Sequence, residues 1–110
     1  MVISPYFCPT MRIIAKRTLR DFWEKHPESE QPLKSWYDEA TKSKWGSFSE
    51  VRALYPRASA VGKDRIVFRI KGNDYRLIVK INYAFETIYI KFVGTHAEYD
   101  KVDAATVNDY

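Results

Sequence analysis

Alternating apolar and cationic residues near the end of the chain constrain its fold more than any other feature. The alternation runs through three consecutive segments within residues 65–93. A period of two places successive side chains on opposite faces of a β-sheet, so pairing of these segments predicts one apolar and one basic face. The apolar face would contain Ile66, Phe68, Ile70, Leu77, Val79, Ile81, Ile88, Ile90 and Phe92, and the basic face Arg65, Arg69, Lys71, Arg76, Lys80, Tyr89 and Lys91. Such a sheet can cover a core with one face and meet a polyanion with the other.

Helical spacing appears earlier in the chain. An apolar stripe with i, i+3, i+4 and i+7 spacing begins at Leu19, after a potential cap at Thr18, and a second begins at Leu33, after a potential cap at Ser29. Residues 47–50 form a capping-box pattern ahead of a short third helix that Pro56 ends. The first two helices can close as a hairpin.

These elements predict an α+β fold. We expect a small antiparallel sheet of about four strands, with residues 12–15 adding one strand to the three alternating segments, and the N-terminal helical hairpin packed on one face. Turn signals at residues 62–64, 72–74 and 84–86 separate the three segments as consecutive hairpins. Residues 11–110 form one domain in this interpretation, and residues 1–10 are an N-terminal extension.

The charge of the chain indicates an anionic partner. Through Lys91 the sequence has 17 Lys and Arg against 10 Asp and Glu, whereas the remainder is acidic and lowers the net charge to +4. Nucleic acid fits this asymmetry better than a membrane surface, because the chain has no basic amphipathic helix with a broad apolar face. A globular domain that is basic without such a partner is the alternative.

Several classes of protein are excluded by missing patterns. The sequence has no apolar run of membrane-spanning length and no secretion signal, so we expect a soluble cytoplasmic protein. Cys8 is the single cysteine, which leaves no disulfide framework or cysteine-based metal site. Phosphate-binding loops and metal-binding motifs are also missing, so we expect neither a cofactor nor a metal.

Cleavage of RNA without a metal is compatible with this residue set, because the 2′-OH of the substrate supplies the nucleophile. The protein must provide proton transfer and cations that stabilise the phosphorane. Arg76 and Lys80 lie four residues apart on one strand and face, and Lys91 projects from the adjacent strand. His96 has a reference pKa suited to acid or base work, and Tyr99 can donate a proton or stack on a base.

Each of these residues also has a purely structural interpretation. His96 can cap the end of the last strand, and Tyr99 can pack in the core. The cationic residues can form the solvated face of the sheet.

Four ordered stretches, residues 11–14, 17–23, 67–78 and 92–101, together resemble the HigB family of toxins from bacterial type II toxin-antitoxin modules. This family belongs to the RelE-like superfamily. The last stretch contains Gly94-Thr95-His96-Ala97-Glu98-Tyr99-Asp100, and the similarity extends over residues 11–107.

The resemblance implies an mRNA interferase, an endoribonuclease that usually cuts messenger RNA in the ribosomal A site. A HigA-like antitoxin would silence it, and operator DNA would be bound only through the toxin-antitoxin complex. The family pattern places catalytic work at Arg76, His96 and Tyr99, with Lys71, Lys80 and Lys91 as supporting cations. His96 stands where many relatives carry arginine, which leaves open whether it acts as acid, base or phosphate ligand.

Two other functions are compatible with the sequence. A non-catalytic RNA- or ribosome-binding module needs the basic face, including Arg65 and Arg69, but does not need His96. Some relatives of the same fold act on gyrase instead of RNA, and for such a toxin the basic face would be secondary.

Overall fold

The computed structural model describes residues 11–62, 64–72 and 74–108. The helices are α1 (Lys16–Lys25), α2 (Glu30–Lys42), α3 (Phe48–Leu54) and α4 (His96–Tyr99), with a 3₁₀ turn, η1 (Pro27–Ser29), between α1 and α2. The strands are β1 (Arg12–Ile14), β2 (Ser59–Val61), β3 (Arg65–Ile70), β4 (Tyr75–Asn82) and β5 (Thr87–Thr95). Residues 1–10, interpreted above as an extension, lie outside the described residues.

The five strands form one mixed sheet in the order β1-β5-β4-β3-β2. β1 runs parallel to β5, and the other neighbours are antiparallel. The predicted α+β class is confirmed, but the expected count of about four strands and the purely antiparallel arrangement are wrong. β2 has only three residues and was not predicted, since so short a segment carries too little alternation to be recognised.

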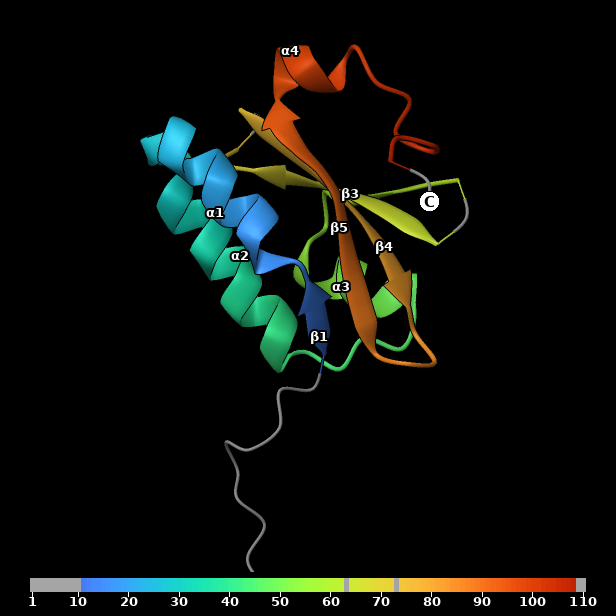
Figure 1. Cartoon of the computed structure of the whole chain (residues 1–110). Coiled ribbons are helices and arrows are strands. Elements are labelled where there is room, and N and C mark those ends of the chain that lie inside the picture. The colour runs from blue at the N-terminus through green and yellow to red at the C-terminus, as the bar shows by residue number, and fades with distance from the viewer. Residues whose placement is uncertain (1–10, 63, 73, 109–110) are drawn as a thin grey trace, which may run out of the picture.

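One face of the sheet carries the hydrophobic core, which α1, α2 and α3 cover (Figure 1). Both predicted apolar stripes point into it, for example through Leu19 and Leu33, which are fully buried. Phe68 of β3 lies at its centre, with ring centroids of Trp36 at 5.4 Å and of Tyr55 at 5.1 Å. The helical hairpin packs on the sheet as predicted because these aromatic side chains bury large areas at one contact.

The helix starts differ in part from the predicted caps. α1 begins earlier than expected, with Ala15 at its N-cap, so Thr18 lies inside the helix. Ser29 does occupy the N-cap of α2, but its hydroxyl donates to the His26 carbonyl at 2.7 Å and makes no capping bond. Ser47 is the N-cap of α3, again without a side-chain capping bond.

A β-bulge in β5 changes the face that its last residues occupy. Ile90 pairs with Val79 and Phe92 pairs with Ile78, so Lys91 is an extra residue between two registered pairs. Val93, opposite Leu77, therefore packs against the core, whereas Phe92 shares the second face with Ile78. The prediction that Phe92 lies on the apolar face is wrong, because a bulge reverses the alternation beyond it.

The second face of the sheet is not simply solvated. Residues 100–108, here called the C-terminal segment, follow α4 and lie on the side opposite the helical hairpin (Figure 1). The Arg65 guanidinium donates to the carbonyls of Ala104 and Val107 at 3.1 and 2.7 Å, and Asn108 Nδ2 donates to the Lys91 carbonyl at 2.6 Å. These bonds hold the segment against the sheet.

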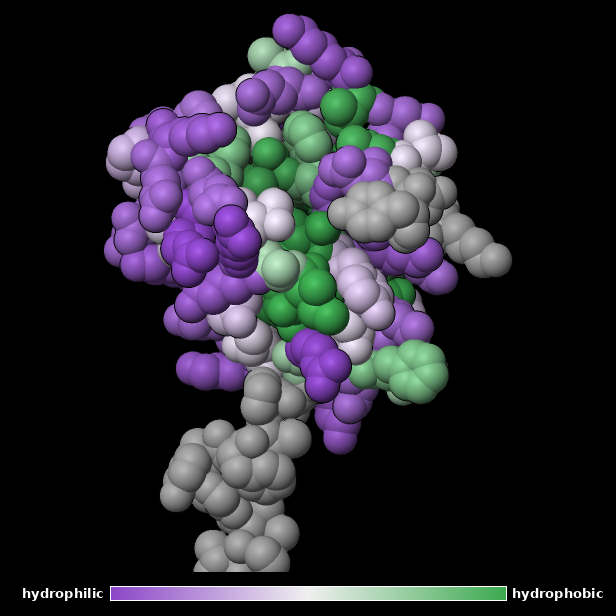
Figure 2. All heavy atoms as spheres, in the orientation of Figure 1, coloured by the Kyte–Doolittle hydropathy of each residue, from purple (hydrophilic) through white to green (hydrophobic). Residues whose placement is uncertain are grey.

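Exposed apolar surface remains beside the hydrophilic helix α1. Figure 2 shows it as a hydrophobic band next to the hydrophilic residues of that helix. Ile14 of β1 is 42% exposed and its partner Tyr89 of β5 is 36% exposed. In the described part of the chain, no helix has the length and hydrophobicity needed to cross a membrane.

The position of Phe68 at the centre of the core leads to a prediction about stability. Phe68→Ala would remove a fully buried ring from the centre of the core, and we expect a loss of about 3–5 kcal/mol in the free energy of unfolding. Phe85→Ala is the matched control, because Phe85 is 78% exposed and should change stability by about 0.5 kcal/mol or less. Urea unfolding followed by tryptophan fluorescence measures both; equal losses would contradict this packing.

Candidate active site

The short helix α4 brings the end of the chain back over the sheet. Thr95 and Glu98 form a capping box, in which the Thr95 hydroxyl accepts from Glu98 N at 3.1 Å and the Glu98 carboxylate accepts from Thr95 N at 2.8 Å. The backbone N–H of His96 also donates to the Asp74 carbonyl at 3.1 Å. These bonds attach α4 to the start of β4 and set the direction of its side chains.

Arg76 lies under this helix, on the second face of β4. It pairs with Arg69 of β3 on one side and with Gly94 of β5 on the other. The Arg76 Cζ lies 5.5 Å from the centroid of the Tyr99 ring, a cation-π contact. The structure thus brings together two of the three predicted catalytic residues, Arg76 and Tyr99.

Positive charge accumulates around Arg76. Burial lowers the pKa of Arg76, which is 7% exposed, and the nearby guanidiniums of Arg69 and Arg57 lower it further. Tyr99 and Asp100 oppose this shift. Arginine stays protonated at neutral pH despite such shifts, so the site presents a cluster of three guanidiniums that favours an anion.

His96 lies at the outer side of the same helix. Its Nδ1 is 3.3 Å from the Asp100 carboxylate, one helical turn further along the chain. Asp100 therefore contacts His96 and also attracts Arg76, which links these two of the three predicted catalytic residues through one acidic group. Both His96 and Asp100 are exposed to a ligand approaching from solvent.

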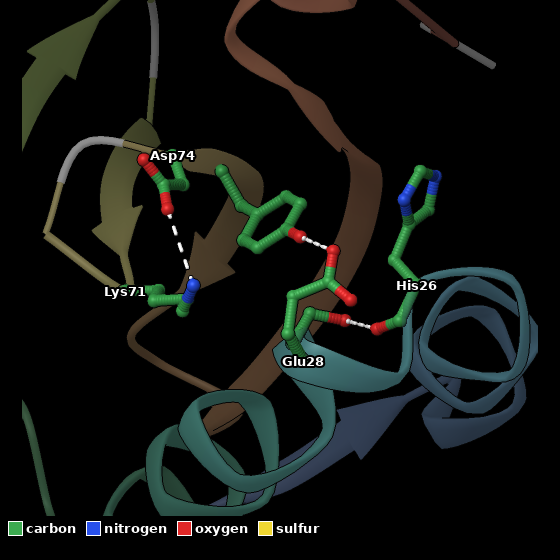
Figure 3. Close-up of polar contacts among 6 residues, drawn as sticks. His26, Glu28, Lys71 and Asp74 are labelled. Atoms are coloured by element: carbon green, nitrogen blue, oxygen red, sulfur yellow. Dashed lines mark hydrogen bonds and ion pairs between the residues drawn. The ribbon is translucent and has the colours of Figure 1, made fainter.

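His96 also lines an open cleft of about 540 Å³ between α4, the β3–β4 turn and η1. Figure 3 shows Lys71 and Asp74 on one side of this cleft, and Glu28 and His26 on the other. The Tyr75 hydroxyl donates to the Glu28 carboxylate across it. This bond lowers the pKa of Glu28 and, together with burial, raises the pKa of Tyr75 to about 12.

The predicted RNA-binding residues do not form one continuous patch. Arg69 is exposed beside Arg76, whereas Lys71 lies in the turn after β3 with its Nζ 3.4 Å from Asp74. Lys80 is partly exposed and lies further along β4, opposite Tyr89 of β5.

Arg65 and Lys91 are buried. Arg65 is 3% exposed and is held by the C-terminal segment, so in this conformation its guanidinium faces the chain itself. Lys91 is 8% exposed, and its Nζ lies 5.8 Å from the Tyr89 ring centroid. The alternation identified the face of these residues but did not reveal what covers them.

Two residues of the site were missed by the sequence analysis. Asp100 could have been found, because the Thr95-to-Glu98 capping-box spacing predicts a helix and places Asp100 one turn after His96. Arg57 carries no such signal, since it lies in the loop after α3 and approaches Arg76 only through the tertiary fold. Within the described residues, no cluster of three or more His, Cys, Asp or Glu side chains is placed to hold a metal ion.

Comparisons with known proteins identify relatives of this chain. A family model described as HigB_toxin, a RelE-like toxic component of a toxin-antitoxin system, matches residues 29–102. An mRNA interferase HigB of Escherichia coli O6:H1 (strain CFT073) is 28% identical over 94 residues, covering 84% of this chain and 91% of the relative. An mRNA interferase toxin HigB of Escherichia coli K12 is 26% identical over 92 residues, covering 82% of this chain and 88% of the relative.

The bond between Tyr75 and Glu28 predicts a pH-dependent contribution to stability. Because the pKa of Glu28 is lowered in the folded state, the stabilisation is present above the unfolded pKa and disappears as pH falls through the folded pKa. Tyr75→Phe should therefore lower the melting temperature near neutral pH and lose this effect in acid. Thermal unfolding across that pH range measures the difference in melting temperature, with the exposed Tyr89→Phe as control. A difference that does not change with pH would contradict the role of the bond between Tyr75 and Glu28.

Proposed function

This chain belongs to the HigB toxin family, the RelE-like toxic components of toxin-antitoxin systems, and from that premise we propose that it is an endoribonuclease that cleaves messenger RNA. The family model covers two thirds of the chain, and relatives of similar length are named mRNA interferases. The observation that supports the proposal most is the guanidinium cluster at Arg76, which lies against Tyr99 and is linked to His96 through Asp100.

In the proposed reaction, the 2′-OH of the substrate attacks the adjacent phosphorus, and the bond to the 5′-oxygen breaks. A base must take the 2′-OH proton, an acid must protonate the 5′-oxygen, and cations must stabilise the phosphorane. Arg76 would supply the main cationic stabilisation, with His96 and Tyr99 transferring protons. Because Arg76 lies within the sheet and contacts Tyr99, its charge is held in place before the substrate arrives.

The contact with Asp100 favours one protonation pattern of His96. When Nδ1–H donates to the carboxylate, the neutral ring carries its lone pair on Nε2, which is then available to accept a proton. We therefore assign His96 to the general base and Tyr99, whose ring lies beside Arg76, to the general acid. Asp100 acts as a positioning residue in this scheme.

RNA contacts are assigned according to exposure. Arg69, Lys71 and Lys80 are at least partly exposed and would contact the phosphate backbone around the cut. Arg65 and Lys91 are buried, and their RNA-binding role stays a prediction.

The toxin has an antitoxin partner, as the toxic component of a toxin-antitoxin system. We propose a HigA-like antitoxin for that role, with operator DNA bound only by the toxin-antitoxin complex. We further propose that cleavage depends on the ribosome, which would present the messenger in an extended conformation to this shallow site.

Substitution of Arg76 tests the proposed activity. We expect Arg76→Ala to lower cleavage by about 10²–10³-fold, the range found when a preorganised charge donor is removed. Primer extension on a defined messenger, with and without translating ribosomes, measures this, and Arg20→Ala on the exposed face of α1 is the control. Because Arg76 is buried, circular dichroism must show that the variant is folded, and Arg76→Lys provides a less disruptive change.

The outcomes separate the candidate functions. Cuts that require ribosomes and disappear with Arg76→Ala support the interferase. Intact messenger with the native, folded and antitoxin-free protein would overturn it, and would favour an RNA-binding module or a toxin directed at gyrase.

A second substitution tests the role of Asp100. Asp100→Asn retains a hydrogen-bonding side chain but removes the charge beside His96, and we expect a lower rate constant at saturating messenger with little change in the concentration needed for saturation. The pH profile of cleavage should also change, because the tautomer of His96 is no longer fixed. Asp103→Asn in the exposed C-terminal segment is the control. An unchanged rate and pH profile would remove Asp100 from the mechanism.

A further inference from the structure

A pocket of about 250 Å³ lies between the end of α3 and the part of β3 that β2 does not cover. β2 pairs only with residues 65–67 of β3, so the following residues form an open edge of the sheet. The wall of the pocket includes Leu54, Tyr55, Pro56 and Phe68, and its charged members are Arg57 and Arg69. The proposed function above leaves this pocket without a role.

The apolar part of the pocket is built from packed side chains at the edge of the core. Phe68 is fully buried, and the Tyr55 ring lies edge-on to it at 5.1 Å. The Tyr55 hydroxyl donates to the Glu39 carboxylate of α2, which anchors the ring at its far end. Leu54 is 47% exposed at the same place, so its side chain is accessible to a ligand. Pockets for drug-sized ligands measure about 300–1,000 Å³, so this one suits a smaller planar group.

The charged part of the pocket connects it to the candidate active site. Arg69 lies in the pocket wall and is also directly opposite Arg76 across the β3–β4 pair. Arg57 lies in the same wall, and its positive charge lowers the pKa of Arg76. A ligand in the pocket would therefore have two guanidiniums between itself and the place where Arg76 would hold the scissile phosphate.

These features match the way proteins bind single-stranded RNA. Such sites combine cations that follow the phosphate backbone with apolar or aromatic surfaces that receive individual bases. On the premise of the proposed function, we propose that the pocket binds the base of a messenger nucleotide next to the cut, with Arg57 and Arg69 contacting the phosphate that joins it to the scissile position. Because the residues of the wall are mainly apolar, the base is held by its faces and shape, and the site tolerates different bases.

A binding experiment with uncleavable RNA tests this proposal. The full chain is titrated with a trinucleotide carrying 2′-O-methyl groups, and the dissociation constant is measured from NMR shifts of the Leu54 methyl groups and the Gly72 amide at the pocket. We expect Arg57→Gln to weaken binding by about tenfold, the effect typical of losing a hydrogen bond to a charged group. Arg52→Gln is the matched control, because Arg52 is exposed on α3, carries the same charge and is not part of the pocket wall.

An abasic trinucleotide separates the base pocket from general charge attraction. Removing the base should weaken binding to the native chain by about tenfold. Removing the base should have little effect on the binding of the trinucleotide to the Leu54→Glu variant, because its new carboxylate would obstruct the pocket and repel the RNA backbone. Leu54 is exposed, so this variant should fold, and its amide spectrum verifies this.

The results distinguish this proposal from the proposed function. The pocket proposal is overturned if Arg57→Gln binds the trinucleotide as tightly as Arg52→Gln. It is also overturned if removal of the base weakens binding equally for the native and the Leu54→Glu protein, or if the native chain binds no trinucleotide. Cleavage by the native chain in the assay above would then still stand. Conversely, pocket-dependent binding by a chain that never cuts RNA would support the pocket and overturn the endoribonuclease.

Discussion

The β-bulge at Lys91 determines how the candidate active site is assembled. It moves Gly94 onto the second face, opposite Arg76, while Val93 returns to the core. A Cβ at Gly94 would lie 2.6 Å from Cζ of the Phe92 ring and 2.9 Å from the Glu98 carboxylate, so any larger residue would require these two side chains to shift. The chain can therefore turn directly from β5 into α4 and place Tyr99 beside Arg76. Without the bulge, the glycine would face the core and the helix would begin on the wrong side.

The electrostatics of the site are those of a surface prepared for an anion. Arg57, Arg69 and Arg76 come from a loop and two strands, and the charges of Arg57 and Arg69 both act on Arg76. Tyr99 and Asp100 offset part of that repulsion, and burial of Arg76 makes the uncompensated part stronger. A phosphate group that enters the cluster would lower the remaining repulsion, because it supplies the negative charge that the protein does not. Specific charge placement therefore explains the site better than net charge does, because the whole chain is only moderately basic.

The C-terminal segment limits the size of the basic face. Its Ala104 and Val107 carbonyls accept hydrogen bonds from Arg65 Nη1, and Asn108 Nδ2 donates to the Lys91 carbonyl. Its acidic composition suits this position against a basic sheet. Val67 and Ile78 are buried on the same face, so part of the second face is an interior surface and not a nucleic-acid platform. The ligand-accessible cations are consequently concentrated near α4 and the β3–β4 turn.

The periodicities of the sequence predict the classes and positions of most elements, because helical and strand patterns are local and strong in residues 16–42 and 65–95. The sequence also identified Arg76, His96 and Tyr99 as candidates, and the structure places them around one short helix. The faces of Phe92 and Gly94 are instead set in the folded sheet, since a bulge is a register choice between two strands. The approach of Arg57 to Arg76 and the burial of Arg65 were likewise decided there, because both depend on segments far apart in the chain meeting across the sheet.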